Sequence, residues 1–167
     1  MIVKKILLVS LSVFCLVGCD YTSKKIAKDS LKDISVHSYL GGNLKFVYVE
    51  NPGGMLSFGS DLPVKSRLII FQLLVSLLLV SLFVYTILMQ RIKKWSLIAL
   101  ILILSGGIGN LLDRITNEGR VVDFMMMGIY SFRTGIFNIA DVYITFGVLV
   151  LILSEIFLKD HSAKIAS

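Results

Sequence analysis

Four long apolar segments constrain how this chain can fold more than any other feature. The clearest runs over 68–89, 22 residues in which Gln72 is the only strongly polar side chain. Segments 95–112, 136–158 and 3–22 have comparable length, and a helix needs about 20 apolar residues to cross a bilayer. Charged residues make up only 17% of the chain, whereas soluble domains carry about 25%. The pattern predicts one integral membrane domain over 1–167, an all-α membrane protein with four transmembrane helices.

The first segment allows two interpretations. After Lys4 its charge-free part, Ile6–Cys19, has only 14 residues, which suits a secretory signal as well as a short span. Leu16–Cys19 also resembles a lipobox, the processing site of bacterial lipoproteins, so a lipoprotein anchored through Cys19 is one alternative. The three later spans favour the other interpretation, an uncleaved first helix over 3–22.

The polar stretch 23–67 is expected to lie on the outer membrane surface. Leu44–Glu50 is rich in β-branched and aromatic residues and predicts a strand. Asn51–Gly54 has the composition of a turn, and Met55–Phe58 could return as a second strand. A small sheet on the membrane surface is therefore expected. In the second outer segment, 113–135, the apolar centre is expected to be an interfacial loop.

Basic residues predict the orientation. Four spans place both termini on one side, and short loops weigh most in the positive-inside rule. We therefore expect both termini in the cytoplasm, together with seven basic residues concentrated in three short segments: Lys4, Lys5, Arg91, Lys93, Lys94, Lys159 and Lys164. The net charge of +6 fits basic loops beside an anionic leaflet and gives no reason to expect nucleic acid as a partner.

Two carboxylates stand out against this apolar background. Asp141 opens the fourth segment and Asp123 lies in the loop before it. A carboxylate inside a bilayer costs at least about 2.5–3.5 kcal/mol and usually marks a functional site. Two neighbouring carboxylates can share a proton and act as general acid and base in hydrolysis. The alternative is a small proton-coupled transporter or channel with Asp20 and Asp141 along its path, for which Asp123 in the outer loop would not be needed.

Five motifs resemble those of the bacterial lipoprotein signal peptidases (signal peptidase II), in the family's order. They are Asp20-Tyr-Thr-Ser-Lys24, Asn51-Pro-Gly-Gly-Met-Leu-Ser-Phe58, Gly106-Gly-Ile-Gly-Asn-Leu-Leu-Asp-Arg114, Val121-Val-Asp-Phe124 and Phe137-Asn-Ile-Ala-Asp141. The first two are weak signals alone, while the last three, in this order and spacing, are specific. The resemblance departs at Met55 and Leu56, which are bulkier than the family's usual residues.

The resemblance implies an aspartic endopeptidase of the bacterial plasma membrane with its active site near the outer face. It would remove the signal peptide from a prolipoprotein, just before a cysteine that carries diacylglycerol. The implied partners are lipid-modified prolipoproteins and membrane lipid. A single subunit without metal or cofactor would suffice.

The same resemblance assigns roles to individual residues. Asp123 and Asp141 would be catalytic. Substrate-binding or supporting roles would fall to Asn51, Gly53, Asn110, Arg114, Asn138, Asp20 and Lys24. Gly106 and Gly107 would allow close helix packing, and Asp113 is expected to fix Arg114 through an ion pair or hydrogen bond.

Overall fold

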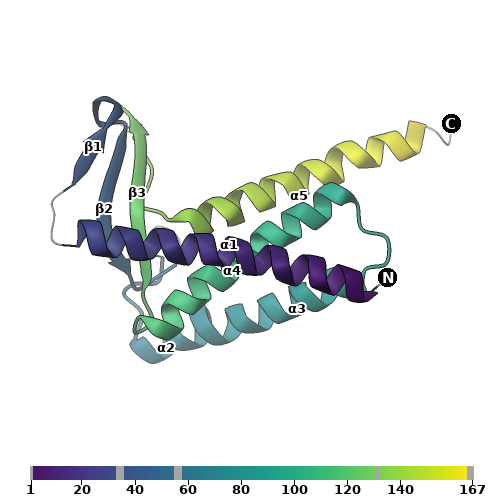
Figure 1. Ribbon diagram of the computed structural model, residues 1–167, viewed down its shortest axis with the longest axis horizontal. Coiled ribbons are helices and arrows are strands. Elements are labelled where there is room, and N and C mark those ends of the chain that lie inside the picture. The colour runs from purple at the N-terminus through teal and green to yellow at the C-terminus, as the bar shows by residue number, and fades with distance from the viewer. Residues whose placement is uncertain (1, 33–35, 55–57, 131, 165–167) are drawn as a thin grey trace.

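Four long helices and one small sheet make up the part of the chain that the structure describes (Figure 1). The computed structural model describes residues 2–32, 36–54, 58–130 and 132–164, with side chains up to 156 in the last helix. The bundle is formed by α1 (Ile2–Leu31), α3 (Val75–Leu88), α4 (Lys94–Thr116) and α5 (Ile139–Lys164). The sheet stands across one end of this bundle, and α1 begins at the opposite end (Figure 1).

The helices confirm the predicted all-α membrane class. By length and composition, four described helices could cross a membrane. The second one is built from α2 (Val64–Leu68), a π-helical stretch, η3 (Ile69–Leu74), and α3. The first helix continues well past residue 22 to Leu31, because its charged outer turns have one buried face. Members of that face at helical spacing are Asp20, Lys24 and Ala27.

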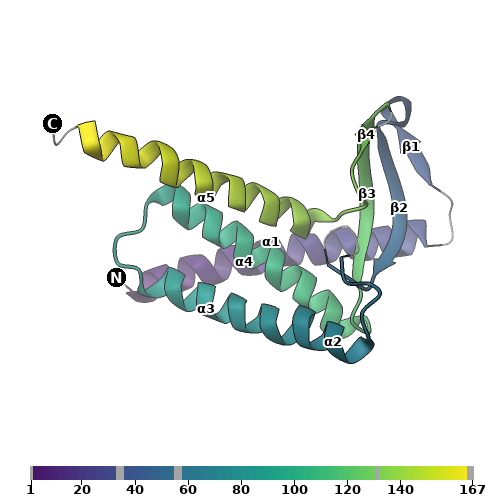
Figure 2. The same cartoon turned by 180° about the vertical axis from the view of Figure 1, so that it is seen from behind.

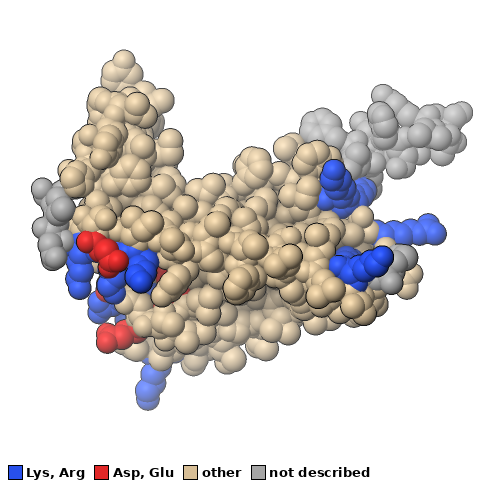
Figure 3. All heavy atoms as spheres, in the orientation of Figure 1, with Lys and Arg blue, Asp and Glu red and all other residues tan. Residues whose placement is uncertain are grey.

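The helix α4 lies at the centre of the bundle. In the most apolar stretch of α4, 44% of the residues are buried, whereas the corresponding share is 6% in α1 and in the second span. A core cluster from α1, α3 and α4 consists of Val9, Leu79, Ile87, Ile101 and Leu104. The other helix faces expose apolar side chains, and in Figure 3 an uncharged belt separates charged groups at the two ends. This is the surface expected of a protein whose middle lies in lipid.

The sheet has four antiparallel strands in the order β1-β2-β3-β4. They are β1 (His37–Tyr39), β2 (Leu44–Asn51), β3 (Val121–Ile129) and β4 (Phe132–Arg133). The strand predicted at Leu44–Glu50 is therefore present as β2. The prediction of an interfacial loop around Phe124 is wrong, since this segment is β3 and pairs with β2. The predicted return strand at Met55–Phe58 falls largely on residues 55–57, which lie outside the described residues.

The pairing of β2 with β3 brings two site residues together. Asn51 lies opposite Val121, and Val49 lies opposite Asp123, so side chains of the two strands share a face. The register shifts between Phe46 and Val49, which is the signature of a bulge. Beyond this shift the pairing is regular, and the last residue of β2, Asn51, donates to the carboxylate of Asp123 at 3.0 Å.

Glycines on α4 allow three neighbours to approach closely. A Cβ at Gly106 would collide with the backbone carbonyl of Ala140 on α5, and one at Gly107 would lie 2.5 Å from Leu79 on α3. A Cβ at Gly109 would lie 2.6 Å from the carboxylate of Asp20 on α1. At Gly106 and Gly107 the neighbouring helices therefore come close to α4, and the contact at Gly106 lies beside the first turn of α5.

Candidate active site

Asp141 is held in the first turn of α5 by a reciprocal cap. The backbone N–H of Asn138 donates to Asp141 Oδ2 at 3.1 Å, and the backbone N–H of Asp141 donates to Asn138 Oδ1 at 3.0 Å. This is the arrangement of a capping box, with Asn138 as N-cap and Asp141 three residues later. A carboxylate here also benefits from the positive end of the helix dipole. The start of α5 therefore fixes both the position and the orientation of Asp141.

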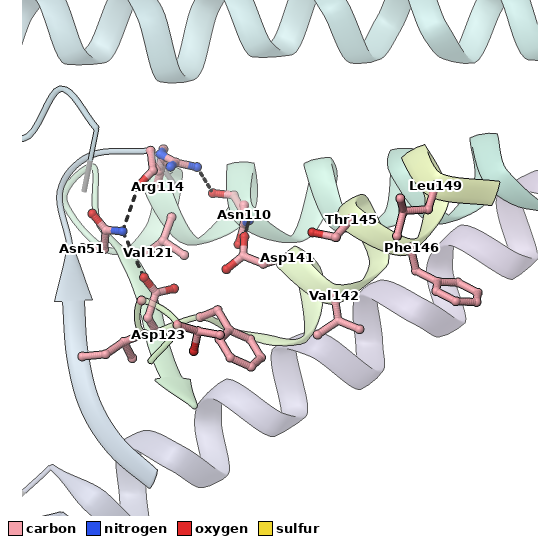
Figure 4. Close-up of a pocket in the computed structure, with 15 residues that line it drawn as sticks. Asn51, Asn110, Arg114, Val121, Asp123, Asp141, Val142, Thr145, Phe146 and Leu149 are labelled. Carbon is pink, nitrogen blue, oxygen red and sulfur yellow. Dashed lines mark hydrogen bonds between the residues drawn. The ribbon is translucent and has the colours of Figure 1, made fainter. Parts of the chain in front are cut away.

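Asp123 enters the same site from the sheet, and its side chain is buried with 4% exposure. The Nδ2 of Asn138 donates to Asp123 Oδ1 at 2.7 Å, and the Nδ2 of Asn51 donates to Asp123 Oδ2 at 3.0 Å. Figure 4 shows the Asp123 and Asp141 side chains facing the same space from opposite sides. Because Asn138 contacts both carboxylates, it ties the two acids together.

Asn110 on α4 provides a second link. Its Nδ2 donates to Asp141 Oδ1 at 2.8 Å, while its Oδ1 accepts the ammonium of Lys24 at 3.0 Å. Since an ammonium can only donate, the oxygen of this amide must face Lys24 and its N–H₂ must face Asp141. Asn138 also donates to the same oxygen, at 3.2 Å. Lys24 thus determines the orientation of an amide that contacts Asp141.

Lys24 belongs to a buried ionic cluster beneath the site. It pairs with Asp20 at 2.7 Å and with Asp113 at 3.0 Å, and the Lys24 side chain is 3% exposed. Asp20 also accepts the backbone N–H of Ala140 at 2.9 Å, which satisfies an amide in the first turn of α5. Asp113 accepts the backbone N–H of Val122 at 3.1 Å and so attaches β3 to α4.

The expectation that Asp113 pairs with Arg114 is wrong for the described residues. The contacts of Asp113 are Lys24 and Val122, because successive residues on a helix point in different directions. Arg114 instead donates to the carbonyls of Gly53 at 2.8 Å and Asn110 at 2.9 Å, and stacks over the Phe71 ring at 5.4 Å. Its guanidinium therefore joins the turn after β2 to α4.

The turn after β2 is further held by Asn51. Its Oδ1 accepts the backbone N–H of Gly53 at 2.9 Å, and its Nδ2 donates to the carbonyl of Gly54 at 3.0 Å. The Asn51 amide therefore has a fixed orientation, with N–H directed at Asp123. Arg114 Nε is buried and has no partner among the described atoms, so one donor of this guanidinium is unsatisfied.

The two aspartates line one cavity of about 360 Å³. Its polar end is formed by Asn51, Asn110, Arg114, Asp123 and Asp141. Its apolar end continues along α5 and includes Val142, Thr145, Phe146 and Leu149 (Figure 4). A ligand with a polar group to be attacked and an apolar part to be buried would fit this division.

Burial has the largest effect on the pKa of Asp123, and its hydrogen bonds and the neighbouring charges have smaller effects. Loss of solvent raises its pKa from 3.8 to about 6, with a smaller upward contribution from the charge of Asp141, while the Asn51 and Asn138 hydrogen bonds act in the opposite direction. Asp123 therefore keeps a proton at a pH where an ordinary carboxyl group has lost it. In the described part of the chain, no group of three His, Cys, Asp or Glu side chains could hold a metal ion.

The structure brings the polar candidate residues and Gly53 into one connected group, whereas Gly107 packs against Leu79 on α3 and lies outside it. Two features of the site were not predicted from the sequence. One is the apolar wall on α5. The other is a pair of residues of the second span, Phe71 and Gln72, that support Arg114. Gln72 Nε2 donates to the Arg114 carbonyl at 3.1 Å. A signal for the wall was present, since Thr145 and Leu149 follow Asp141 at intervals of four and share its helix face.

Comparison with known proteins identifies the family. A profile of the family described as signal peptidase (SPase) II matches residues 12–157. A lipoprotein signal peptidase of Borrelia duttonii is 37% identical over 132 residues, covering 77% of this chain and 76% of the relative. One from Borrelia hermsii is 34% identical over 161 residues, 92% of each chain.

Solved structures agree with the sequence comparison. A bacterial membrane enzyme determined by the in meso method at 2.3 Å matches with a TM-score of 0.78 and 28% identity, covering 93% of this chain and 90% of that one. A second such enzyme, at 1.9 Å, matches with a TM-score of 0.75 and 25% identity over 89% of this chain. The chain therefore belongs to the signal peptidase II family and is a membrane peptidase.

Proposed function

We propose that this protein removes the signal peptide from diacylglyceryl-modified prolipoproteins, cutting on the N-terminal side of the lipidated cysteine, with Asp123 and Asp141 as the catalytic pair. The observation that carries the proposal is the shared cavity, in which both carboxylates face one space and an apolar wall adjoins them. The relatives in Borrelia are named lipoprotein signal peptidases, which supports the same substrate class.

The geometry supports a direct attack by water. Asp141 accepts two N–H groups, from the Asn110 side chain and the Asn138 backbone, which orient its carboxylate toward the cavity. Asp123, whose pKa burial raises to about 6, is assigned the role of proton donor in this mechanism. Ionised Asp141 would take a proton from water as the water attacks the scissile carbonyl, and Asp123 would donate its proton to the developing oxyanion. On collapse the C–N bond would break as Asp141 gives its proton to the leaving nitrogen, and Asp123 would take back the proton of the hydroxyl group as the carbonyl reforms, which restores the starting protonation of the pair.

The other groups of the site would bind and orient the substrate. Arg114 lines the polar end of the cavity and would contact the substrate backbone there, and the Thr145–Leu149 wall would take an apolar part of the substrate. Asp20 holds α5 from a helix that continues unbroken through Cys19, which supports an uncleaved first span. Asp123 comes from the sheet and not from a span, which supports hydrolysis over a proton path across the membrane.

The first prediction is that Asp123→Asn and Asp141→Asn each lower kcat by at least about a thousandfold, since an amide can neither donate an acidic proton nor take one from water. The measurement uses purified protein in detergent and a diacylglyceryl-modified peptide, with mass spectrometry of the cleavage position. Asp29→Asn, on the exposed outer end of α1, is the matched control and should cleave normally. Full activity in either site variant would refute the assignment of the pair.

A further inference from the structure

The end of the sheet farthest from the active site exposes a cluster of large apolar side chains. We call this cluster the sheet tip. It consists of Tyr39, Leu40, Met127, Ile129, Tyr130 and Phe132. Tyr130 and Phe132 are 91% and 86% exposed, values that a water-facing strand end would not normally give to aromatic residues. The tip therefore needs a partner that the bundle does not provide.

Two turns form the tip as one unit. The β1–β2 connection and the end of β3 lie side by side, because the backbone N–H of Gly128 donates to the carbonyl of Asn43 at 2.8 Å. Leu40 and Tyr130 have positive φ angles of 52° and 53°, a conformation that non-glycine residues adopt rarely. The backbone at Leu40 and Tyr130 therefore has an unfavourable conformation, and both apolar side chains are exposed.

The position of the tip relative to the helices points to its partner. The strands run across the helix axes, and the tip projects sideways beyond α5 (Figures 1 and 2). Since the helices cross the bilayer, a segment that projects sideways at the end of the bundle lies over neighbouring lipid. In Figure 3 this projection carries no visible charge and is continuous with the uncharged belt of the bundle.

The charges near the tip fit a lipid surface. Lys45 and Arg133 are the only Lys, Arg, Asp or Glu residues in 36–49 and 124–137. Cations attract anionic headgroups, and tyrosine is favoured at the depth where headgroups meet acyl chains. The acids of the sheet region, Glu50 and Asp123, lie at the far ends of β2 and β3 from the tip.

We propose that the sheet tip inserts into the interfacial region of the bilayer beside α5, with phospholipid as its partner. Residues 134–137 follow the tip directly and line the catalytic cavity, so an anchored tip holds one wall of the cavity at the membrane surface. A substrate that diffuses within the bilayer would then reach the cavity without a prior movement of the sheet toward the membrane surface. This anchoring does not depend on the chemistry of the aspartates.

Tryptophan fluorescence tests the insertion directly. Trp95 is the only tryptophan of the chain, so Trp95→Phe provides a silent background for single probes. Tyr130→Trp would report on the tip, Phe14→Trp on the lipid-exposed face of α1, and Asp29→Trp on the exposed outer end of α1. The probes are placed in vesicles of phosphatidylglycerol and phosphatidylethanolamine with bromine on the upper part of the acyl chains.

Insertion predicts that bromine quenches the Tyr130→Trp and Phe14→Trp probes strongly, while acrylamide in water quenches mainly Asp29→Trp. A Tyr130→Trp probe that behaves like Asp29→Trp would overturn the proposal. Bromine quenching at the tip that appears only after substrate peptide is added would assign the tip to substrate. Protection from acrylamide that depends on protein density, without bromine quenching, would assign it to a second copy.

Activity provides an independent measurement. The double variant Tyr130→Ser/Phe132→Ser should raise KM several-fold in vesicles and leave kcat unchanged, because the reacting groups are untouched. In detergent, where no continuous bilayer surrounds the protein, the difference in KM should be small. An unchanged KM in vesicles would contradict a contribution of the tip to substrate capture.

Discussion

Three asparagine side chains form the chemical centre of this site, and each has its amide orientation fixed by a group that can only donate. Lys24 faces the oxygen of Asn110, the Asp141 N–H faces that of Asn138, and the Gly53 N–H faces that of Asn51. All three Nδ2 groups must then point to carboxylates. Oriented neutral donors thus hold both acids in place, and at Asp123 the hydrogen bonds from Asn51 and Asn138 partly offset the rise in pKa that burial causes.

The pH profile tests this arrangement at Asn51. The raised pKa of Asp123, about 6, means that its proton is lost as the pH rises through that value, so activity should fall on the alkaline side. Asn51→Leu removes a hydrogen bond that lowers this pKa, and the alkaline limit should therefore move to higher pH. The measurement is kcat against pH on the lipidated peptide, and the limits belong to the coupled pair.

The matched control for this profile is Asn43→Leu, which lies just before the opposite end of β2 and is exposed. It should leave both pH limits in place. A lower kcat for Asn51→Leu with an unshifted or downward-shifted alkaline limit would show that Asn51 acts on the shape of the turn alone and not on the proton of Asp123.

Lys24 contributes to stability and to activity through its position and its charge. Replacing it in Lys24→Met would leave Asp20 and Asp113 buried without their cation and would release the Asn110 amide. Removing one partner of a buried pair costs about 3–5 kcal/mol, so the unfolding temperature and kcat should both fall. Lys25→Met, next in sequence but exposed, should change stability by less than about 0.5 kcal/mol. Equal behaviour of the two variants in detergent-solubilised unfolding and peptide cleavage would contradict this role.

At the scale of elements, the contact of α4 with α5 sets the position of Asp141 relative to Asn110. Gly106 lies against Ala140, the residue before Asp141, and a Cβ there would also come within 2.7 Å of Ile144. Gly106→Ala should push the first turn of α5 away from Asn110. Misplacement of a reacting group by about 1 Å can cost a hundredfold in rate, so kcat should fall at least tenfold while the protein remains in the membrane.

Gly18 on α1 provides a matched control for the Gly106→Ala variant. A Cβ added at Gly18 on α1 would have nothing within 4 Å, and alanine favours helix over glycine by about 0.5–1 kcal/mol. Gly18→Ala should therefore retain full cleavage activity and slightly raise the unfolding temperature. Equal loss of activity in both variants would show that the rate responds to any added methyl group and not to the spacing of α4 and α5.

Elements differ in how far the sequence could predict them. The four helices follow from apolar length, and β2 from its β-branched residues, because both signals are local. The strand β3 was missed, since Phe124–Met127 has the composition of an interfacial loop and becomes a strand only through its pairing with β2. The outer turns of α1 needed a tertiary partner too, as their buried face is defined by Asp113 and Ala140.

For the molecule as a whole, the site residues could be predicted and their connections could not. Motif resemblance selected Asp123, Asp141 and their neighbours, but the partner of Asp113 depends on which side of α4 faces α1. Likewise, nothing local shows that Lys24, 86 positions before Asn110, fixes that amide. The shared cavity is a property of the assembled bundle, sheet and α5.

The orientation of the molecule in the membrane remains a prediction from charge, and it decides on which side the site lies. Basic residues are densest in the short segments at the end away from the sheet, among them the loop around Arg91, which places that end in the cytoplasm. In a Cys15→Ser/Cys19→Ser background, Asp61→Cys and Arg91→Cys each add one exposed thiol at opposite ends. A membrane-impermeant maleimide should label Asp61→Cys in intact cells and Arg91→Cys only after the membrane is permeabilised. The reverse labelling pattern would contradict the orientation and the outer-face active site that the family resemblance implies.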